Sequence, residues 1–228
     1  MTLSSLLLPP LLRSSIPIIG LSCLFAYSVA AADQTSSRQV IGDFSQGSLS
    51  DWQQKTFQGS TDYQLLMVDG RQVLKATSKQ SASALYRTVQ IDLTKTPLLN
   101  WSWRVDAVDA SLNPLAKVGD DYPARIYVVK KGFFPWQAKA LNYVWANSHS
   151  DKAYWPNPFT ASAVMIPVKA GSDGLGRWHT ERVDVKADFL RVFNLSVDTA
   201  DGVSIMSDSD NGKGSTSAYF SELYFSAD

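Results

Sequence analysis

The segment Leu99-Asn100-Trp101-Ser102-Trp103-Arg104-Val105-Asp106 alternates apolar and polar side chains without a break. Successive side chains of an extended strand point to opposite faces, so the four apolar side chains share one face and the four polar ones share the other. This alternation is typical of a half-buried strand in an antiparallel sheet. The segment therefore predicts a sheet that packs two tryptophans into a core.

The rest of the sequence extends this prediction. Residues 63–68 and 71–76 flank Asp69-Gly70, and a two-residue loop of this type between apolar runs predicts a β-hairpin. Residues 186–193 predict a short helix. We therefore expect an all-β fold, an antiparallel β-sandwich that is jelly-roll-like, with one short helix. The other strands are expected at 84–91, 124–130, 140–146, 163–168, 178–185, 203–206 and 218–225.

The N-terminal segment differs in composition from the rest. One charged side chain, Arg13, precedes a short apolar run that ends at the small residues Ala30 and Ala32. This pattern is typical of a secretory signal peptide, and the alternative is a membrane anchor, for which the run is marginal in length. The predicted organisation is a signal peptide at 1–32, a flexible stub at 33–37 and a single β-sandwich domain at 38–228.

Charge and cysteine content limit the function. The 228 residues include 21 basic and 21 acidic side chains, whereas a nucleic-acid-binding protein usually has a basic excess, so we expect no nucleic acid partner. Cleavage after residue 32 removes the only cysteine, Cys23, and with it thiol catalysis, disulfides and cysteine metal ligands. An exported chain without cysteine indicates a periplasmic or secreted bacterial protein with no transmembrane segment after cleavage.

Catalytic signatures are missing from the sequence. The two histidines, His149 and His179, do not have the spacing of a zinc site. A serine hydrolase of the G-x-S-x-G type is excluded because that motif does not occur.

Acidic segments supply the polar candidates for a ligand site. Asp120 and Asp121 stand where a predicted strand begins, and Arg125 lies just inside that strand. Two interpretations stay open: an Arg–Asp pair that fixes the loop, or a polar cluster that binds a ligand at the end of the sheet. Glu181, on another predicted strand, is a further candidate, although its surroundings favour a structural role.

The segment 206–215 indicates a cation site. Asp208, Asp210 and Asn211 place oxygen ligands close together before Gly212, as calcium sites often do. The segment departs from the EF-hand loop, because Gly212 stands where a third ligand is expected. The alternative is an ordinary tight turn, which uses the same residue types. Calcium is the one cofactor that the sequence suggests.

Aromatic residues supply the apolar candidates. Loops at 133–136 and 154–159 carry aromatic side chains, and exposed rings beside polar groups are typical of sugar-binding surfaces. Trp136 and Trp145 are the tryptophans that we assign to ligand binding. Trp155 is expected to pack back onto the sandwich, because prolines stiffen its loop. The loop at 133–136 could equally contact a partner.

Five motifs occur together in one order. They are Gly119-Asp120-Asp121-x-x-Ala124-Arg125-x-Tyr127-Val128, Leu141-Asn142-Tyr143-Val144-Trp145, Glu181-Arg182-x-Asp184-Val185-x-x-Asp188-Phe189, Ile205-Met206-x-Asp208-x-Asp210-Asn211 and Ala218-Tyr219-Phe220-x-Glu222-Leu223-x-Phe225. As a set, from about Phe44 to Phe225, they resemble the bacterial family called domain of unknown function 3047. The resemblance implies an exported protein with one sandwich-like domain and lends no activity. Glu222 departs from the Asp expected there.

A looser similarity is to carbohydrate-binding jelly rolls, on the residues Asp43-Phe44, Trp52 and Glu222. Such modules can share a structural calcium between their first and last strands, which implies Asp43 and Glu222 as further metal ligands. This similarity concerns the fold alone and gives little information about function.

Three functions fit these observations. The first is a binding module for a glycan or a cell-envelope component. The second is a carbohydrate-active hydrolase or lyase on the same fold. The third is a structural or assembly protein of the cell envelope. Candidate acids for the second are Asp120, Asp121, Glu181 and Asp208.

Overall fold

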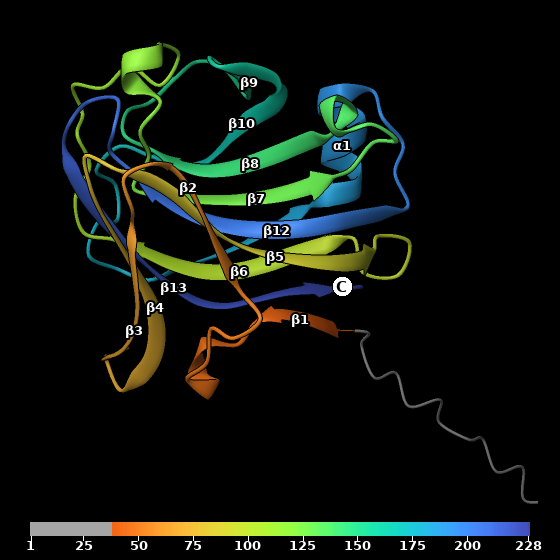
Figure 1. The fold of residues 1–228 in the computed structure, drawn as a ribbon, viewed down its shortest axis with the longest axis horizontal. Coiled ribbons are helices and arrows are strands. Elements are labelled where there is room, and N and C mark those ends of the chain that lie inside the picture. The colour runs from red at the N-terminus through yellow and green to blue at the C-terminus, as the bar shows by residue number, and fades with distance from the viewer. Residues whose placement is uncertain (1–37) are drawn as a thin grey trace, which may run out of the picture. The chain divides into compact units, whose positions relative to one another are not determined.

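The computed structural model describes residues 38–228, which form two β-sheets that pack face to face (Figure 1). Sheet A has the strand order β11-β6-β13-β4-β3, with β1 also pairing β13. Its strands are β1 (Arg38–Gly42), β3 (Asp62–Val68), β4 (Arg71–Lys79), β6 (Leu98–Val105), β11 (His179–Asp184) and β13 (Ser215–Ser226). The predicted signal peptide and stub lie outside the described residues.

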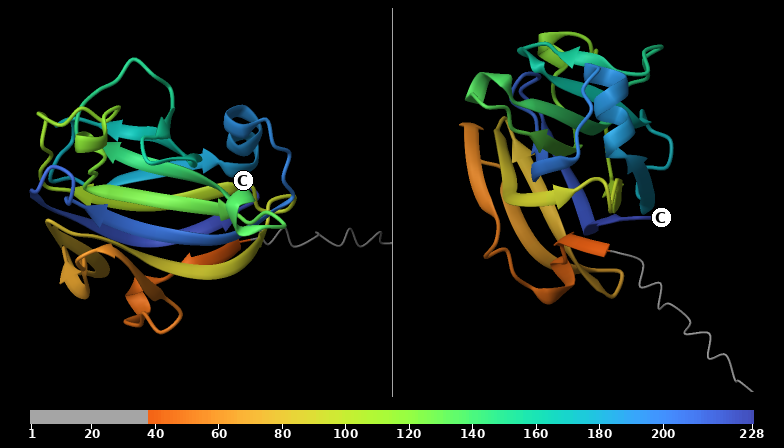
Figure 2. Two further views of the ribbon diagram at one scale, coloured as in Figure 1. Left: turned by 45° about the horizontal axis from the view of Figure 1, so that its top comes forward. Right: turned by 90° about the vertical axis from the view of Figure 1, so that its right-hand side faces the viewer.

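Sheet B has the strand order β2-β5-β12-β7-β8-β10-β9, and β5, β12, β7 and β8 run side by side across Figure 1. Its strands are β2 (Gln53–Gln58), β5 (Ala82–Asp92), β7 (Ala124–Lys130), β8 (Lys139–Ala146), β9 (Trp155–Asn157), β10 (Thr160–Ala170) and β12 (Thr199–Asp208). The helix α1 (Val185–Phe193) lies at one end of these strands in both views of Figure 2. Short 3₁₀ turns occur at η1 (Phe44–Gln46), η2 (Lys117–Gly119) and η3 (Pro135–Gln137).

The chain alternates between the two sheets, since β4, β6, β11 and β13 belong to sheet A while β5, β7, β10 and β12 belong to sheet B. This alternation gives the sandwich its jelly-roll-like character. The predicted all-β sandwich with one short helix is confirmed. One pair departs from antiparallel order, because β10 runs parallel to β8. No helix in the described part of the chain is long and apolar enough to cross a membrane.

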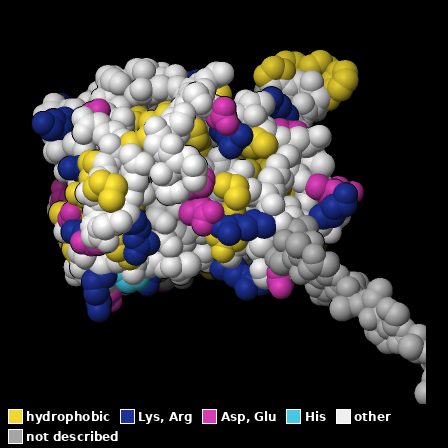
Figure 3. Space-filling model, turned by 90° about the horizontal axis from the view of Figure 1, so that it is seen from below, with side chains coloured by type: hydrophobic (Ala, Val, Ile, Leu, Met, Phe, Trp, Pro, Cys, Tyr) yellow, Lys and Arg dark blue, Asp and Glu magenta, His cyan; other side chains and the backbone are white. Residues whose placement is uncertain are grey.

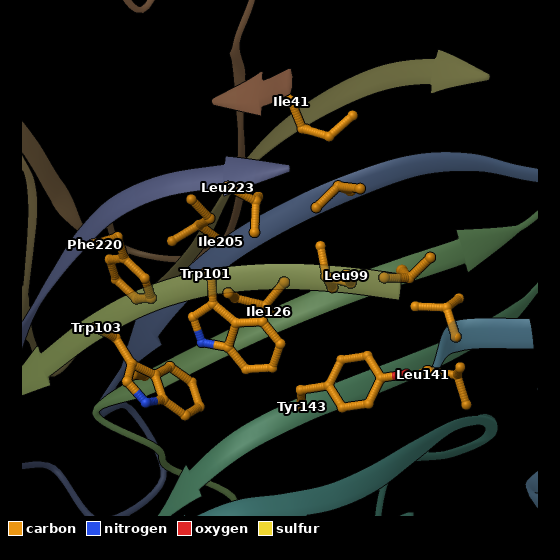
Figure 4. Packing of buried hydrophobic residues seen from close by; sticks show 14 of the residues in the cluster. Ile41, Leu99, Trp101, Trp103, Ile126, Leu141, Tyr143, Ile205, Phe220 and Leu223 are labelled. Carbon is orange, nitrogen blue, oxygen red and sulfur yellow. The ribbon is translucent and has the colours of Figure 1, made fainter. Parts of the chain in front are cut away.

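The core lies between the sheets and begins at the alternating strand β6. The apolar side chains of its alternating face, from Leu99 to Val105, are buried, and Trp101 and Trp103 meet aromatic rings of β8 across the sandwich (Figure 4). The ring centroid of Trp101 lies 5.8 Å from that of Tyr143, and that of Trp103 lies 5.9 Å from that of Trp145. Large aromatic side chains contribute much of the hydrophobic stabilisation of such a core.

The hairpin predicted at Asp69-Gly70 is present between β3 and β4. Both turn residues have positive φ angles, 49° and 77°, as a type I′ turn requires. Three strands were not predicted. In β2 every residue is exposed, so the edge strand has no apolar alternation, and β1 and β9 are too short to show a period.

Candidate functional site

The outer face of sheet B carries the candidate site. The antiparallel registers of β5, β12 and β7 align side chains in rows across the sheet, while the alternate residues of the same strands face the core. The rows on the outer face are Ala84–Met206–Arg125, Tyr86–Ser204–Tyr127 and Thr88–Gly202–Val129. Several of these positions carry small residues, namely Ala84, Gly202 and Ser204. The outer face is therefore recessed there, and a hollow forms over it.

This hollow is a groove of about 840 Å³, within the usual range of ligand sites. Lys55 and Phe57 of β2 line one part of it, and Asn157 at the end of β9 and Phe159 just after it line another. Along β5 the lining runs from residue 82 to residue 88, which spans about 20 Å at the rise of an extended strand. The groove is therefore several sugar rings long.

Aromatic rings occur both at the rim and on the floor of the groove. Phe57 is 61% exposed and Phe159 is 56% exposed, which is high for phenylalanine side chains. On the floor, Tyr86 and Tyr127 are half-buried. The Tyr86 hydroxyl donates to Gln53 Oε1 over 2.6 Å, and the Tyr127 hydroxyl accepts from Arg125 Nη1 over 3.0 Å. These four rings give the groove apolar faces with polar groups between them.

A buried charge cluster borders one end of the groove. Arg125 is 2% exposed and donates through Nη2 to the Asp208 carboxylate and to the backbone carbonyl of Asp120. Its guanidinium lies over the Tyr122 ring, 4.3 Å from the centroid. The second oxygen of Asp208 accepts the backbone N–H of Tyr122 over 3.1 Å. These contacts tie the end of β12 to the loop that precedes β7.

Burial controls the ionisation of this cluster. Loss of solvent raises the pKa of Asp208 well above its usual range, and the neighbouring Asp120 and Asp121 carboxyls add to the rise, while the Arg125 guanidinium opposes it. The pKa of Asp120 is also raised by burial, against the opposing effects of Arg125 and of the Asn157 amide, which donates to it over 2.8 Å. Two carboxyls thus share one buried guanidinium.

Asp121, Asp208 and Asp210 bring carboxylate oxygens within 4.8 Å of one another, a spacing at which a cation could bind. The Asp121 oxygens already accept two backbone N–H groups, from Asn211 over 3.0 Å and from Gly212 over 2.6 Å. Asp208 is engaged by Arg125, as described above. Because internal donors already neutralise much of this cluster, a calcium ion would have to displace them, and melting with and without calcium tests the site that the sequence suggests.

The structure gathers most of the predicted ligand residues in one place. The segment before β7 supplies Asp120 and Asp121, the start of β7 supplies Arg125, and the end of β12 supplies Asp208, next to Asp210 and Asn211. The Arg–Asp contacts of the first interpretation are present and border the groove, while ligand binding by this segment stays a prediction. A Cβ atom at Gly212 would lie 3.0 Å from the end of the Leu112 side chain, which is tighter than an ordinary contact and would require that side chain to shift.

Other predicted ligand residues lie elsewhere. Trp145 is completely buried and its indole N–H donates to the carbonyl of Gly171, so the prediction that it contacts a ligand is wrong. Glu181 belongs to sheet A, where it accepts from the indole of Trp103 over 3.2 Å and where burial raises its pKa. Trp136 is exposed, but in a loop outside the groove lining. The prediction that Trp155 packs back is confirmed, because it is 3% exposed.

The predicted metal ligands Asp43 and Glu222 have other partners. Asp43 caps η1, and hydrogen bonds from the Ser45 hydroxyl in particular lower its pKa. Glu222 pairs with Arg38 over 2.5 Å. Within residues 38–228, only the Asp121, Asp208 and Asp210 group has three acidic or histidine side chains close enough to share an ion. A calcium site at Asp43 and Glu222 therefore gains no support.

Sequence reasoning missed the residues that shape the groove. Phe57 lies on an exposed edge strand that has no apolar period, so no pattern marked it. Tyr127 was visible as the neighbour of Arg125 on one strand face, but nothing in the sequence showed that Tyr86 would lie in the same row. Such alignment depends on the pairing register of three strands that are distant in sequence.

Residues 50–224 match the model of the family described as "Protein of unknown function (DUF3047)". The chain belongs to this family. The part that matches the DUF3047 model contains every residue that lines the groove, so the groove is a feature of the family region and not of an added segment. A comparison with curated proteins finds no match to the chain.

Solved structures share the sandwich architecture at low similarity. A family 11 carbohydrate-binding module from Clostridium thermocellum, in complex with a β-1,3-1,4-mixed-linked tetrasaccharide, is 10% identical, with a TM-score of 0.47 over 83% of this chain and 95% of that one. A family 29 carbohydrate-binding module mutant complexed with mannohexaose is 10% identical, with a TM-score of 0.39 over 84% and 92%. The glycoside hydrolase domain of Endo-D from Streptococcus pneumoniae is 10% identical, with a TM-score of 0.42 over 78% of this chain and 22% of that one. Similarity at this level carries no conclusion about what the DUF3047 chain binds.

Proposed function

We propose that this protein is a glycan-binding module and that its binding site is the groove over sheet B. The observation that carries the proposal is the combination of an open groove of about 840 Å³ with exposed Phe57 and Phe159 at its rim and small or apolar side chains on its floor. Exposed phenylalanines beside a preformed hollow are unfavourable in water unless a ligand covers them.

The chemistry of the lining fits an oligosaccharide. The C–H face of a sugar ring packs against an aromatic face, and its hydroxyl groups need both donors and acceptors. The lining supplies Asp210 and Asn211 as polar partners at one end and Lys55 and Lys131 as donors elsewhere, with Ser204 on the floor. A long, shallow groove also suits an extended chain better than a compact small molecule.

The buried carboxyls favour binding over hydrolysis. A glycosidase needs one carboxyl as acid and another as base or nucleophile, on opposite sides of the bond to be cleaved. Here Asp120 and Asp208 both contact the one guanidinium of Arg125, and Asp208 is also held by a backbone N–H group. This arrangement fixes the end of the groove and leaves those carboxyls engaged within the protein.

The location of the ligand is part of the same proposal. The sequence of residues 1–32 predicts export, so the glycan would be met in the periplasm or outside the cell, as a component of the cell envelope or as a free oligosaccharide.

The proposal is tested with the full chain and a panel of soluble oligosaccharides and envelope polysaccharides. We expect saturable binding by calorimetry, with the ligand recovered unchanged by chromatography. Phe57→Ser and Phe159→Ser should each weaken binding about tenfold or more, since each removes a ring from the rim. Met67→Ser is the matched control, because Met67 is 64% exposed but lies on sheet A. Equal binding by all variants would contradict the proposal, and a cleaved ligand would favour the hydrolase.

A further inference from the structure

The loop between β7 and β8 carries three exposed aromatic side chains that the groove does not use. Phe133 is 89% exposed, Trp136 is 72% exposed and Phe134 is 44% exposed. Figure 3 shows, in keeping with these values, an apolar group that projects beyond the body of the domain. So much aromatic surface on a projecting loop is costly in water, which indicates that something covers it.

The conformation of this loop is well defined. Phe134 N donates to Gln137 Oε1 over 3.0 Å, and Gln137 N donates back to the Phe134 carbonyl over 3.0 Å, which closes the turn η3. Gly132 permits the closure, because a Cβ atom there would lie 2.3 Å from that of Gln137. The rings are also ordered: Phe134 and Trp136 stack at 4.6 Å and 4°, and Phe133 meets Phe134 edge-on at 4.8 Å.

Basic side chains surround the base of the loop. Lys130, Lys131 and Lys139 flank it in sequence. Asp201 pairs with Lys130 over 3.2 Å and accepts the backbone N–H of Lys131 over 2.8 Å, so one of the three positive charges is neutralised. Lys139 lies 5.4 Å from the Phe193 ring centroid and, like Lys131, makes no ion pair within the described part of the chain. The aromatic tip therefore has two uncompensated positive charges behind it.

We propose that this loop inserts into the surface of a lipid bilayer with anionic headgroups. Tryptophan and phenylalanine favour the boundary between headgroups and acyl chains, where the apolar ring is covered and the indole N–H still finds acceptors. Lys131 and Lys139 would lie at the level of the headgroup phosphates and add electrostatic attraction.

A lipid surface fits this loop better than a glycan does. The only hydrogen-bonding side chains from Gly132 to Ala138 are those of Trp136 and Gln137, and the Gln137 oxygen is already used within the loop. The tip is also convex, whereas recognition of a sugar needs a surface that receives its hydroxyl groups. A lipid surface needs neither property, so the aromatic tip does not depend on the groove or on its ligand, although Lys131 at its base also lines the groove.

The test uses the full chain with vesicles of phosphatidylglycerol and phosphatidylcholine in equal parts, some of them made with brominated lipid, which quenches nearby tryptophan fluorescence. The first tryptophan of the sequence is Trp52, so residues 1–37 contribute no signal. Of the others, Trp101, Trp103, Trp145 and Trp155 are buried in the sandwich. We expect quenching in the wild-type chain, and loss of most of it in Trp136→Phe at equal vesicle binding.

Further variants separate the loop from other causes of binding. The double change Phe133→Ser and Phe134→Ser should lower the vesicle partition coefficient at least about tenfold, since two rings no longer leave water. Lys139→Glu, a change outside the groove lining, should weaken binding to these vesicles but not to pure phosphatidylcholine, and Met67→Ser should change nothing. The proposal is overturned if the wild-type chain does not bind vesicles, if Trp136→Phe is quenched like the wild type, or if the double variant binds equally well.

Discussion

Replacement of Arg125 by methionine is the change whose consequence the structure defines most closely. Arg125 is 2% exposed, donates to Asp208, to the carbonyl of Asp120 and to the Tyr127 hydroxyl, and lies over the Tyr122 ring. Methionine keeps much of the apolar stem and removes the charge and every donor. Asp208 would then be a buried carboxyl with no counter-charge, held by a single backbone N–H.

Removal of one partner from a buried ion pair typically costs about 3–5 kcal/mol, because the other charge remains buried and unpaired. For a domain of this size, such a loss lowers the melting midpoint by roughly 6–20 °C. The loss should be larger at pH 7 than at pH 5. The pKa of Asp208 is already raised by burial, and without Arg125 it rises further, so at lower pH the carboxyl is protonated and the missing charge matters less.

Urea unfolding at the two pH values measures this loss in the full chain. Arg38→Met is the matched control, since the Arg38–Glu222 pair has side chains 42% and 39% exposed and such pairs contribute about 1 kcal/mol or less. Adding Asp208→Asn to Arg125→Met should recover part of the stability, because the orphaned carboxylate is removed. A loss below about 1 kcal/mol in Arg125→Met, or a loss that is independent of pH, would refute the reasoning.

Further predictions concern the same end of the groove. The pKa of Asp210 is raised, mainly by burial and also by Asp121, so the folded state binds this proton more tightly than the unfolded chain and stability falls as pH rises through that range. Thermal melting should therefore show that Asp210→Asn stabilises the protein at pH 7 more than at pH 4; the opposite order would contradict this. Gly212→Ala should cost about 1–3 kcal/mol in urea unfolding, because its Cβ atom would lie 3.0 Å from Leu112 and 3.1 Å from Asp121 Oδ2, and full stability would show that the loop adapts. Calcium should leave the melting midpoint unchanged relative to chelator, because the carboxylates of Asp121 and Asp208 already accept hydrogen bonds from backbone N–H groups and from Arg125. A midpoint that rises with calcium concentration would instead establish an ion site.

The sequence predicted what depends on local periodicity. Strand β6 and the hairpin at Asp69-Gly70 follow from side-chain alternation and turn chemistry, both of which lie within a few residues. The same alternation places Leu141, Tyr143 and Trp145 on one face of β8. The sequence therefore already indicated a core position for Trp145, and its assignment to ligand binding went against that pattern.

The groove depends on longer-range order. Arg125 and Asp208 are 83 residues apart and meet because β7 pairs with β12 in one register, which no local pattern reveals. The sequence grouped Arg125 with Asp120 and Asp121 and placed Asp208 in a separate candidate cation site, so the contact between Arg125 and Asp208 was not predicted. Phe57 was missed because it lies on an edge strand that has no apolar period, whereas Phe159 belongs to the aromatic loop 154–159 that the sequence had already marked.

The most direct test of the glycan-binding proposal is a titration of the full chain with an oligosaccharide that it binds, followed by NMR of the backbone amides. We expect the largest shifts in β5, β12 and β7 and around Phe57 and Phe159, which line the groove. Sheet A should stay unchanged apart from small effects at its edges. Shifts centred on sheet A, or on the loop at Phe133 to Trp136, would contradict the assignment of the groove as the glycan site.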